Sequence, residues 1–259
     1  MTEPAQPERF RILIIGRGNA GKTTILRAVC GVDEEPEVYD GEGNKEPMSI
    51  LSPTALRGEH RIDWELIFPS NSRFVFHDSC GFESGGVQEV EWVRKFIQDK
   101  AGLGSMSKQL HAIWYCFPAD NTRLITAAEK EFFNKIDTGS VPVIAIITKF
   151  DALDAAACTS LLERGVPFEV AQEIAHLYAT ETFNKGSLPI LEALAHRPKA
   201  VVHLRSIFST CSLISELIQS TAASLDSDAL KMLLVQAQRV NVELCMKGAV
   251  NRWVPSITI

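Results

Sequence analysis

The sequence has little positive charge for its length of 259 residues. Its 26 lysines and arginines stand against 32 aspartates and glutamates, which gives a formal net charge of −6. General binding to nucleic acid or to acidic membranes depends on a basic surface that releases counterions from phosphates. The composition therefore argues against both roles. Residues 33–46 carry seven acids and one lysine, and we interpret this segment as a solvated acidic loop.

Long apolar runs and closely spaced cysteines are also missing. The longest apolar stretch, residues 141–147, is far too short to cross a bilayer. The N-terminal residues contain no apolar signal core, and no lipidation motif is present. The six cysteines lie at least 34 residues apart, with no metal-ligand spacing. These absences predict a cytoplasmic protein without a membrane span or lipid anchor, and its 46% hydrophobic residues suffice for a full core.

Short apolar runs alternate with helical patterns along the chain. This alternation predicts an α/β fold, with a mostly parallel sheet and helices on both faces. Such sheets bind ligands at the carboxyl ends of their strands. We expect a main domain over residues 1–225, with a flexible N-terminus at 1–9 and a long loop at 31–59. A helical extension, capped by Asp226 or Ser227, should occupy residues 226–259. The expected strands are 11–15, 61–68, 73–77, 112–117, 141–148 and 200–204, and the expected helices are 22–30, 87–100, 122–136, 154–184 with a break near 165–167, and 210–224.

A glycine-rich segment, Gly16-Arg17-Gly18-Asn19-Ala20-Gly21-Lys22-Thr23, follows the first expected strand and opens the first expected helix. It fits the pattern G-x-x-x-x-G-K-[ST], in which glycines let backbone amides surround a polyphosphate. The helix N-terminus adds a favourable field. In this pattern Lys22 reaches the β- and γ-phosphates, and the Thr23 hydroxyl binds Mg²⁺. An ordinary strand-to-helix turn would need neither the lysine nor the threonine.

Two further motifs follow strands later in the chain. Asp78-Ser79-Cys80-Gly81 ends the strand at 73–77, where the carboxylate can hold Mg²⁺ through water and Gly81 can approach a γ-phosphate. Thr148-Lys149-Phe150-Asp151 ends the strand at 141–148. The Asp151 carboxylate can accept both N1–H and N2–H of guanine, and the Lys149 stem can lie over the base. Taken alone, each motif is weak, and Asp151 or Asp154 could simply cap a helix.

Together, in this order, GRGNAGKT, DSCG and TKFD resemble the phosphate loop, second switch and guanine-reading motif of the P-loop GTPases. The resemblance spans roughly residues 10–206. DSCGF is similar to the D-T-P-G-F of septin-like, AIG1-like and Era-like branches, and the Gly16-Arg17 opening is similar to AIG1-like proteins. The resemblance implies a three-layer G domain that binds GTP or GDP with Mg²⁺. The implied nucleotide-binding residues are Gly16, Gly18, Asn19, Ala20, Gly21, Lys22, Thr23, Thr24, Thr148, Lys149, Asp151 and Ser206.

The sequence departs from this family at three places. Phe82 stands where small GTPases carry a glutamine that orients water, and a phenylalanine ring cannot do so. Thr54 is the only threonine between Thr24 and the strand at 61–68, so we assign it as the first-switch threonine, although a plain turn residue is an equal alternative. The usual S-A-K is missing, and Ser206 is its positional substitute.

These motifs predict a GTP-binding switch that hydrolyses GTP slowly. Its catalytic residues would be Lys22, Thr54 and Gly81, and its Mg²⁺ ligands Thr23, Asp78 and Thr54. We expect a GTP-dependent G-domain homodimer to supply the missing catalytic group, with Arg17, Arg57 and Arg61 as candidates, and an unidentified effector. Arg17 could instead be solvent-exposed or neutralise phosphate charge. The rival interpretations are an ATP-using P-loop enzyme and a degenerate G domain that binds nucleotide as a scaffold.

Overall fold

The computed structural model describes residues 9–47, 62–79, 87–102, 106–121, 123–205 and 211–238. Several residues named above lie outside these ranges, namely Thr54, Cys80, Gly81, Phe82 and Ser206. The arginines at 57 and 61 lie outside them as well.

In the described part of the chain, the core is one eight-stranded sheet, mostly parallel, in the order β3-β2-β4-β5-β1-β6-β7-β8. The five strands from β5 to β8 in this order run parallel, whereas β2, β3 and β4 are joined by antiparallel pairs at one edge. The fold is therefore α/β, as the alternating sequence pattern predicts. The strands are β1 (Phe10–Gly16), β2 (Glu37–Tyr39), β3 (Lys45–Glu46), β4 (Glu65–Phe68), β5 (Asn71–Asp78), β6 (Ala112–Pro118), β7 (Val143–Thr148) and β8 (Ala200–His203).

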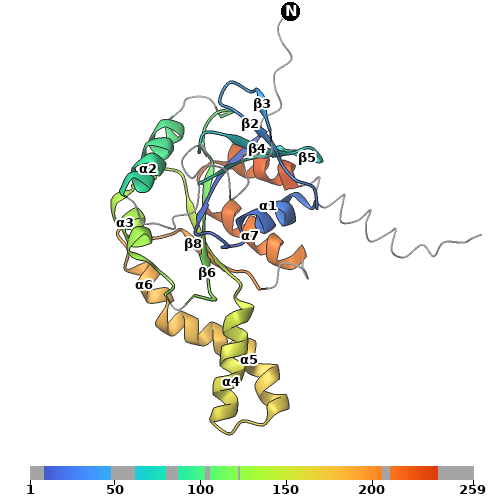
Figure 1. Ribbon diagram of the computed structural model, residues 1–259, viewed down its shortest axis with the longest axis vertical. Coiled ribbons are helices and arrows are strands. Elements are labelled where there is room, and N and C mark those ends of the chain that lie inside the picture. Colours follow the sequence, from blue (N-terminus) through green and yellow to red (C-terminus); the bar gives the residue numbers. More distant parts are fainter. Residues whose placement is uncertain are drawn as a thin grey trace, which may run out of the picture.

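Helices cover both faces of the sheet (Figure 1). Because alternate residues of a strand point to opposite faces, β1 supplies Ile12 and Ile14 to one apolar cluster and Leu13 and Ile15 to the other. The first cluster includes residues of α1, α7 and the helix at 228–238, and the second includes residues of α2 to α6. The helices are α1 (Lys22–Cys30), α2 (Val87–Ala101), α3 (Ala127–Lys135), α4 (Asp151–Glu163), α5 (Phe168–Gly186), α6 (Leu188–Glu192) and α7 (Cys211–Ser224).

Two helices project from the body of the molecule. In Figure 1, α4 and α5 extend away from the sheet as a hairpin. The break between them lies at Gly165, which has φ 83°, and Pro167, which precedes α5. Because a proline cannot continue a helix and glycine accepts positive φ, the chain reverses there. The buried face of α5 is built mainly of alanines, which lets the two helices pack closely.

The acidic segment is not the continuous loop that its composition predicts. Residues 37–39 and 45–46 pair as the short hairpin β2–β3 at the sheet edge. The Asp40 carboxylate accepts hydrogen bonds from the amides of Glu42 and Asn44, which closes the turn. Lys45 pairs with Glu37 across the strands at 2.6 Å. Edge pairing with β4, a tertiary contact, therefore overrides the local preference for loop.

One other expectation needs correction. The predicted helix at 122–136 begins only at Ala127, because Thr126 and Glu129 form a capping box that fixes its start. On the helix α2, the large apolar side chain of Trp92 is 58% exposed. It lies on the outer face of α2, whereas Val90, Val93, Phe96 and Ile97 are buried.

The last described helix spans residues 228–238. The Ser227 hydroxyl accepts a hydrogen bond from the Leu230 amide at 3.4 Å, so Ser227 rather than Asp226 caps the helix. Leu233, Leu234 and Ala237 are buried in the same cluster as α1. The division of the chain at residue 225 stays a prediction. No helix in the described part of the chain is long and apolar enough to cross a membrane.

Strand register brings the motifs to one edge. Ile14 of β1 pairs with Asp78 of β5, and Gly16 pairs with Cys116 of β6. Pro118 pairs with Thr148 of β7 in turn. Because the strands are parallel, the segments that follow them all emerge at the carboxyl edge of the sheet, where ligands bind in such folds.

Candidate nucleotide-binding site

The phosphate loop connects β1 to α1 with an unusual backbone. Asn19 has φ 58° and Gly21 has φ 78°, both left-handed. The Ala20 amide bonds the Arg17 carbonyl at 3.2 Å, and the first helical bond of α1 runs from the Ile25 amide to Gly21. The amides of Lys22, Thr23 and Thr24 precede that bond, so they have no intrahelical acceptor. Amides and a helix N-terminus arranged in this way bind anions.

Gly16 lies against β6 with no room for a side chain. A Cβ atom built there would lie 2.7 Å from the Cys116 carbonyl oxygen and 2.9 Å from the Cys116 Cβ. Burial raises the pKa of the Cys116 thiol to about 12, so it stays neutral beneath the loop. A glycine is therefore required here by close contact with a neighbouring strand.

We expect Gly16→Ala to displace the phosphate loop from β6. The added methyl group must push against backbone, which costs about 1–3 kcal/mol as overpacking does elsewhere. Thermal unfolding should detect this loss, and nucleotide binding should weaken with it. Gly139→Ala is the control for added bulk, since nothing lies within 4 Å of a Cβ there, although its positive φ adds some strain. A Gly16→Ala protein as stable as Gly139→Ala, with unchanged binding, would contradict this account of the loop.

Lys22 folds back over the phosphate loop. Its Nζ donates to the Gly16 carbonyl at 3.0 Å and to the Arg17 carbonyl at 3.3 Å. The same nitrogen lies 3.9 Å from Asp78 Oδ1, and the side chain is only 11% exposed. The loop thus holds the ammonium group beside the amides and beside the end of β5, where a phosphate would need it.

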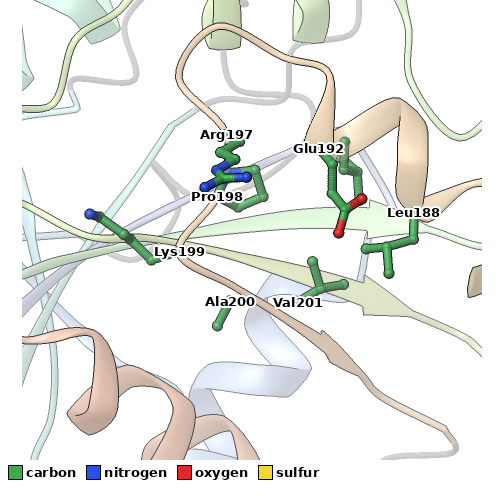
Figure 2. Close-up of a pocket in the computed structure, with 8 residues that line it drawn as sticks. Leu188, Glu192, Arg197, Pro198, Lys199, Ala200 and Val201 are labelled. Atoms are coloured by element: carbon green, nitrogen blue, oxygen red, sulfur yellow. The ribbon is translucent and has the colours of Figure 1, made fainter.

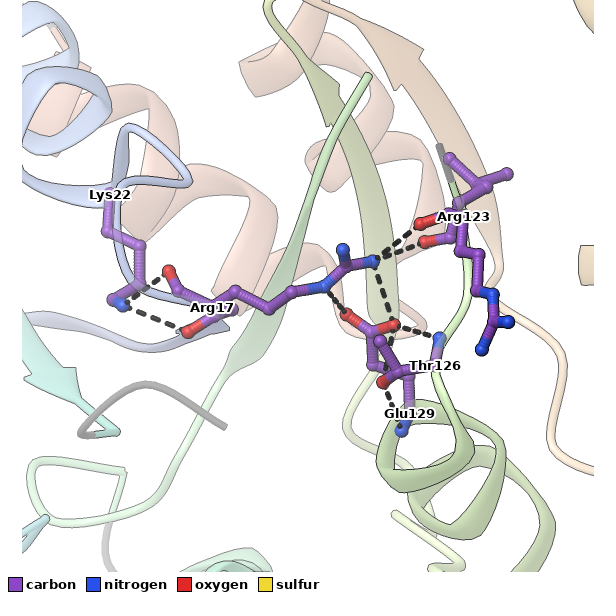
Figure 3. A network of polar contacts seen from close by, with 7 residues as sticks. Arg17, Lys22, Arg123, Thr126 and Glu129 are labelled. Atoms are coloured by element: carbon purple, nitrogen blue, oxygen red, sulfur yellow. Dashed lines mark hydrogen bonds and ion pairs between the residues drawn. The ribbon is translucent and has the colours of Figure 1, made fainter. Parts of the chain in front are cut away.

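Arg17 is not the solvent-exposed residue that one sequence-based interpretation expects, since its side chain is only 14% exposed. Its Nε and one terminal nitrogen donate to the two carboxylate oxygens of Glu129 at 2.9 and 3.1 Å. The same terminal nitrogen also donates to the carbonyls of Arg123 and Leu124 (Figure 3). The guanidinium group therefore lies against the segment between β6 and α3.

Thr23 and Asp78 stand as the candidate Mg²⁺ ligands in the described part of the chain. Thr23 is exposed in the first turn of α1, and Asp78 is half-buried at the end of β5 beside Lys22. One hydroxyl and one carboxylate are hard oxygen donors, too few for a protein-only cage. This fits Mg²⁺, which keeps waters and takes its other ligands from substrate phosphates. No group of three or more metal-ligating side chains occurs among the described residues.

The TKFD segment turns directly from β7 into α4. Thr148 is fully buried, and Lys149 adopts φ 54°, an uncommon conformation for a residue with a side chain. The Lys149 ammonium pairs with Asp120 at 2.7 Å. Asp151 is exposed at the start of α4, whose N-terminus has no side-chain cap. The helix-cap alternative for Asp151 therefore fails, and the Asp154 carboxylate accepts a hydrogen bond from Arg205 instead.

Arg205 ties the end of β8 to the TKFD segment. Its guanidinium lies 4.7 Å from the Phe150 ring centroid, and its Nε donates to Asp154 at 2.8 Å. The Phe150 amide bonds the Leu204 carbonyl at 3.0 Å. These contacts hold residues 204–205 against the segment that includes Asp151. Ser206 would follow at once, but it lies outside the described residues.

Sequence reasoning missed Asp120, Glu129 and Arg205. The capping-box pattern of Thr126 and Glu129 is readable in the sequence, but it predicts only a helix start. Nothing local predicts that Glu129 binds Arg17, because 112 residues separate them. The same holds for Asp120 and Lys149, which are 29 residues apart.

A separate pocket of about 470 Å³ lies at the other end of the sheet. Its lining includes Leu188 and Glu192 from α6 and the segment 197–201, which enters β8 (Figure 2). Since this is the amino end of β8, the pocket is remote from the phosphate loop and takes no part in the candidate site.

No family model matches the chain. It is similar to GTPase Der from Lawsonia intracellularis (strain PHE/MN1-00), with 27% identity over 144 residues. This match covers 56% of the chain, and it spans only 27% of that protein's length.

Among solved structures, the chain resembles the FeoB G domain from Methanococcus jannaschii, with TM-score 0.39 and 14% identity over 85% of this chain and 99% of that one. It also resembles Era in complex with MgGDPNP and nucleotides 1506–1542 of 16S ribosomal RNA, with TM-score 0.43 and 17% identity over 85% of this chain and 58% of that one. Neither likeness is close enough to add weight to an assignment.

The assignment rests on the motifs and on where the fold places them. A phosphate loop, an aspartate and a TKFD segment follow strands of one sheet and meet at its carboxyl edge. The sequence match to a GTPase agrees with this arrangement. In its motifs and in the edge of the α/β sheet that carries them, the chain thus resembles the G domain of P-loop GTPases.

Proposed function

We propose that this protein binds GTP, hydrolyses it slowly and acts as a nucleotide-dependent switch. The observation that carries the proposal is the position of Asp151. Its carboxylate is exposed and caps no helix, and it follows the β7 strand at the edge that also carries the phosphate loop. A carboxylate in that position selects guanine through two donated hydrogen bonds, which adenine cannot make.

The residues of the site divide the work of binding between phosphates and base. Lys22 and the first-turn amides of α1 neutralise the charge of the β- and γ-phosphates. Thr23 and Asp78 would hold Mg²⁺, which supplies positive charge to the same oxygens when bound. At the other end, Lys149 lies beside the base and Asp151 reads its edge. Catalysis in such a site is positioning and electrostatic stabilisation, without covalent chemistry by the protein.

The switch part of the proposal rests on sequence. Thr54 and Gly81 would contact the γ-phosphate and order their loops in the GTP state only. Both residues lie outside the described ranges, as does Ser206, which would support the guanine.

The described cysteines Cys30, Cys116 and Cys158 are free thiols, which suits the reducing cytoplasm. The effector is a further component that the switch requires.

Slow hydrolysis follows from Phe82, which cannot orient water. A second G domain facing the nucleotide could supply the missing group, an effect worth about 10³-fold or more in related chemistry. Arg17 is unsuitable, because Glu129 already binds its guanidinium. Arg57 and Arg61 therefore remain as the arginine candidates.

We expect GTP turnover per molecule to rise with protein concentration in the presence of Mg²⁺. The measurement is steady-state phosphate release, paired with light scattering in GDP and in a non-hydrolysable GTP analogue. A dimer should form with the analogue alone. Constant turnover by a monomer in both states would contradict the dimer mechanism. Binding of GTP without any single-turnover hydrolysis would instead favour the scaffold interpretation. Phe82 and the missing S-A-K motif are the sequence features that support that interpretation.

A further inference from the structure

Glu129 is the most deeply buried carboxylate in the described part of the chain, and the proposed mechanism does not use it. It is 0% exposed, and it lies in the first turn of α3, the helix that follows β6 along the chain. A carboxylate in such a place needs strong partners, because burial penalises its charge. Figure 3 shows these partners converging on it from two directions.

The partners of Glu129 come from its own helix and from the phosphate loop. On the helix side, Oε2 accepts from the Thr126 amide at 2.6 Å and from the Thr126 hydroxyl at 2.9 Å. On the other side, Arg17 donates two parallel hydrogen bonds, one to each carboxylate oxygen. Such bidentate pairs fix geometry as well as charge. The carbonyls of Arg123 and Leu124 take further bonds from the same guanidinium.

The Arg17 side chain anchors the phosphate loop to the segment between β6 and α3. Among the hydrogen bonds between described residues, no other side chain of residues 16–21 reaches another element. The Arg17 backbone carbonyl in turn accepts from Lys22 Nζ at 3.3 Å and from the Ala20 amide at 3.2 Å. A continuous chain of bonds therefore runs from Glu129 through Arg17 to the lysine that faces the phosphates.

The ion pair between Arg17 and Glu129 also affects the electrostatic field at the phosphate site. Glu129 compensates Arg17, so the pair adds almost no net field to the phosphate site, which depends on Lys22 and on the amides. If Arg17 were lost alone, an uncompensated buried anion would remain behind the phosphate loop. That anion would oppose a polyphosphate, in addition to releasing the loop.

We propose that Glu129 is a positioning residue for the phosphates of the bound nucleotide and acts through Arg17 on the phosphate loop and Lys22. This inference rests on the proposed function, since it assumes that the loop binds a guanine nucleotide. It predicts an effect on ligands that fill the phosphate loop, GTP and GDP, and little effect on GMP, which lacks the β- and γ-phosphates.

The test compares GTP and GMP affinities by calorimetry, with Mg²⁺, for four variants of the full chain. Arg17→Met removes the anchor. Glu129→Gln removes the negative charge but keeps a side-chain oxygen that can accept a hydrogen bond from the Thr126 amide. Arg17→Met/Glu129→Gln removes both. Glu131→Gln is the matched control on the same helix, because Glu131 is partly exposed and pairs only with Lys135 among the described side chains.

We expect Arg17→Met to lower the GTP-to-GMP affinity ratio by about tenfold, because it releases the phosphate loop and leaves the buried Glu129 anion behind it. Glu129→Gln should lower it less, and Glu131→Gln should leave it unchanged. The double variant should bind GTP no more weakly than Arg17→Met, because it lacks the same anchor but leaves no uncompensated anion behind the loop. A purely structural pair would instead lower stability and leave the ratio at its wild-type value.

Each outcome decides the matter. A folded Arg17→Met protein with the wild-type ratio overturns the positioning role. If Arg17→Met does not fold, the double variant, which leaves no buried anion, gives the answer by the same ratio. Wild-type protein that fails to prefer GTP over GMP would contradict the proposed function itself, whereas a selective wild type with unaffected variants contradicts only the role of Glu129.

Discussion

Lys22→Ala is expected to weaken GTP binding by about tenfold or more while leaving the fold intact. The ammonium group lies at the mouth of the phosphate loop, held by the Gly16 and Arg17 carbonyls and near Asp78. A charge-assisted hydrogen bond in such a site is worth about 1.5–3 kcal/mol, and about 1.4 kcal/mol corresponds to a factor of ten in affinity. Calorimetric titration with GTP and Mg²⁺ measures the effect.

The control for Lys22→Ala is Lys185→Ala. Lys185 lies on the exposed face of α5 and pairs with Glu181, far along the chain from the phosphate loop. It should bind GTP as the wild type does, and thermal unfolding should show that both variants fold. If Lys22→Ala binds GTP as tightly as Lys185→Ala, Lys22 has no contact with the phosphates and the phosphate-loop assignment is wrong.

Asp151→Asn should exchange the preference for GTP for a preference for XTP. The substitution replaces one acceptor oxygen with a donor amide, which faces the N–H donors of guanine. An unmatched buried donor costs about 1–3 kcal/mol, so a loss of GTP affinity on the order of tenfold to a hundredfold is expected. Xanthine carries a carbonyl at position 2, and this oxygen accepts the new amide hydrogen.

Competition between GTP and XTP for the variant measures this exchange. Asp228→Asn serves as the control, because Asp228 lies on the surface, 94% exposed, at the start of the last described helix. It should keep the wild-type preference. A variant at Asp151 that still prefers GTP to XTP would show that another group reads the base.

Local sequence signals predicted most of the fold and the edge of the sheet at which the described candidate site residues lie. The helix Lys22–Cys30 has the expected bounds, because Gly21 begins it and Gly31 ends it in left-handed conformations. The buried strands β1, β6 and β7 are unambiguous apolar runs between turns. The order of three motifs along alternating strands was enough to place Asp78 and Asp151 at one edge of the sheet.

The features that sequence reasoning missed depend on contacts between distant segments. β2 and β3 are too short and too acidic to predict, and they exist because the edge of β4 offers backbone partners. Trp92 faces solvent, because the buried face of α2 is formed by residues at three- and four-residue spacing, Val90, Val93, Phe96 and Ile97. Arg17 pairs with Glu129, and Asp120 pairs with Lys149. No local sequence pattern predicts a partner so far along the chain.

The central claim is that the site selects a guanine nucleotide, and calorimetric titration of nucleotide-free protein with GTP and with ATP tests it most directly. Both titrations are made with Mg²⁺ on the full chain. The position of Asp151 predicts that GTP binds and that the affinity for ATP is lower by about a hundredfold or more. A site built for two hydrogen bonds rejects a base that cannot make them. Equal binding of ATP and GTP would contradict the claim, because Asp151 would then not read the base.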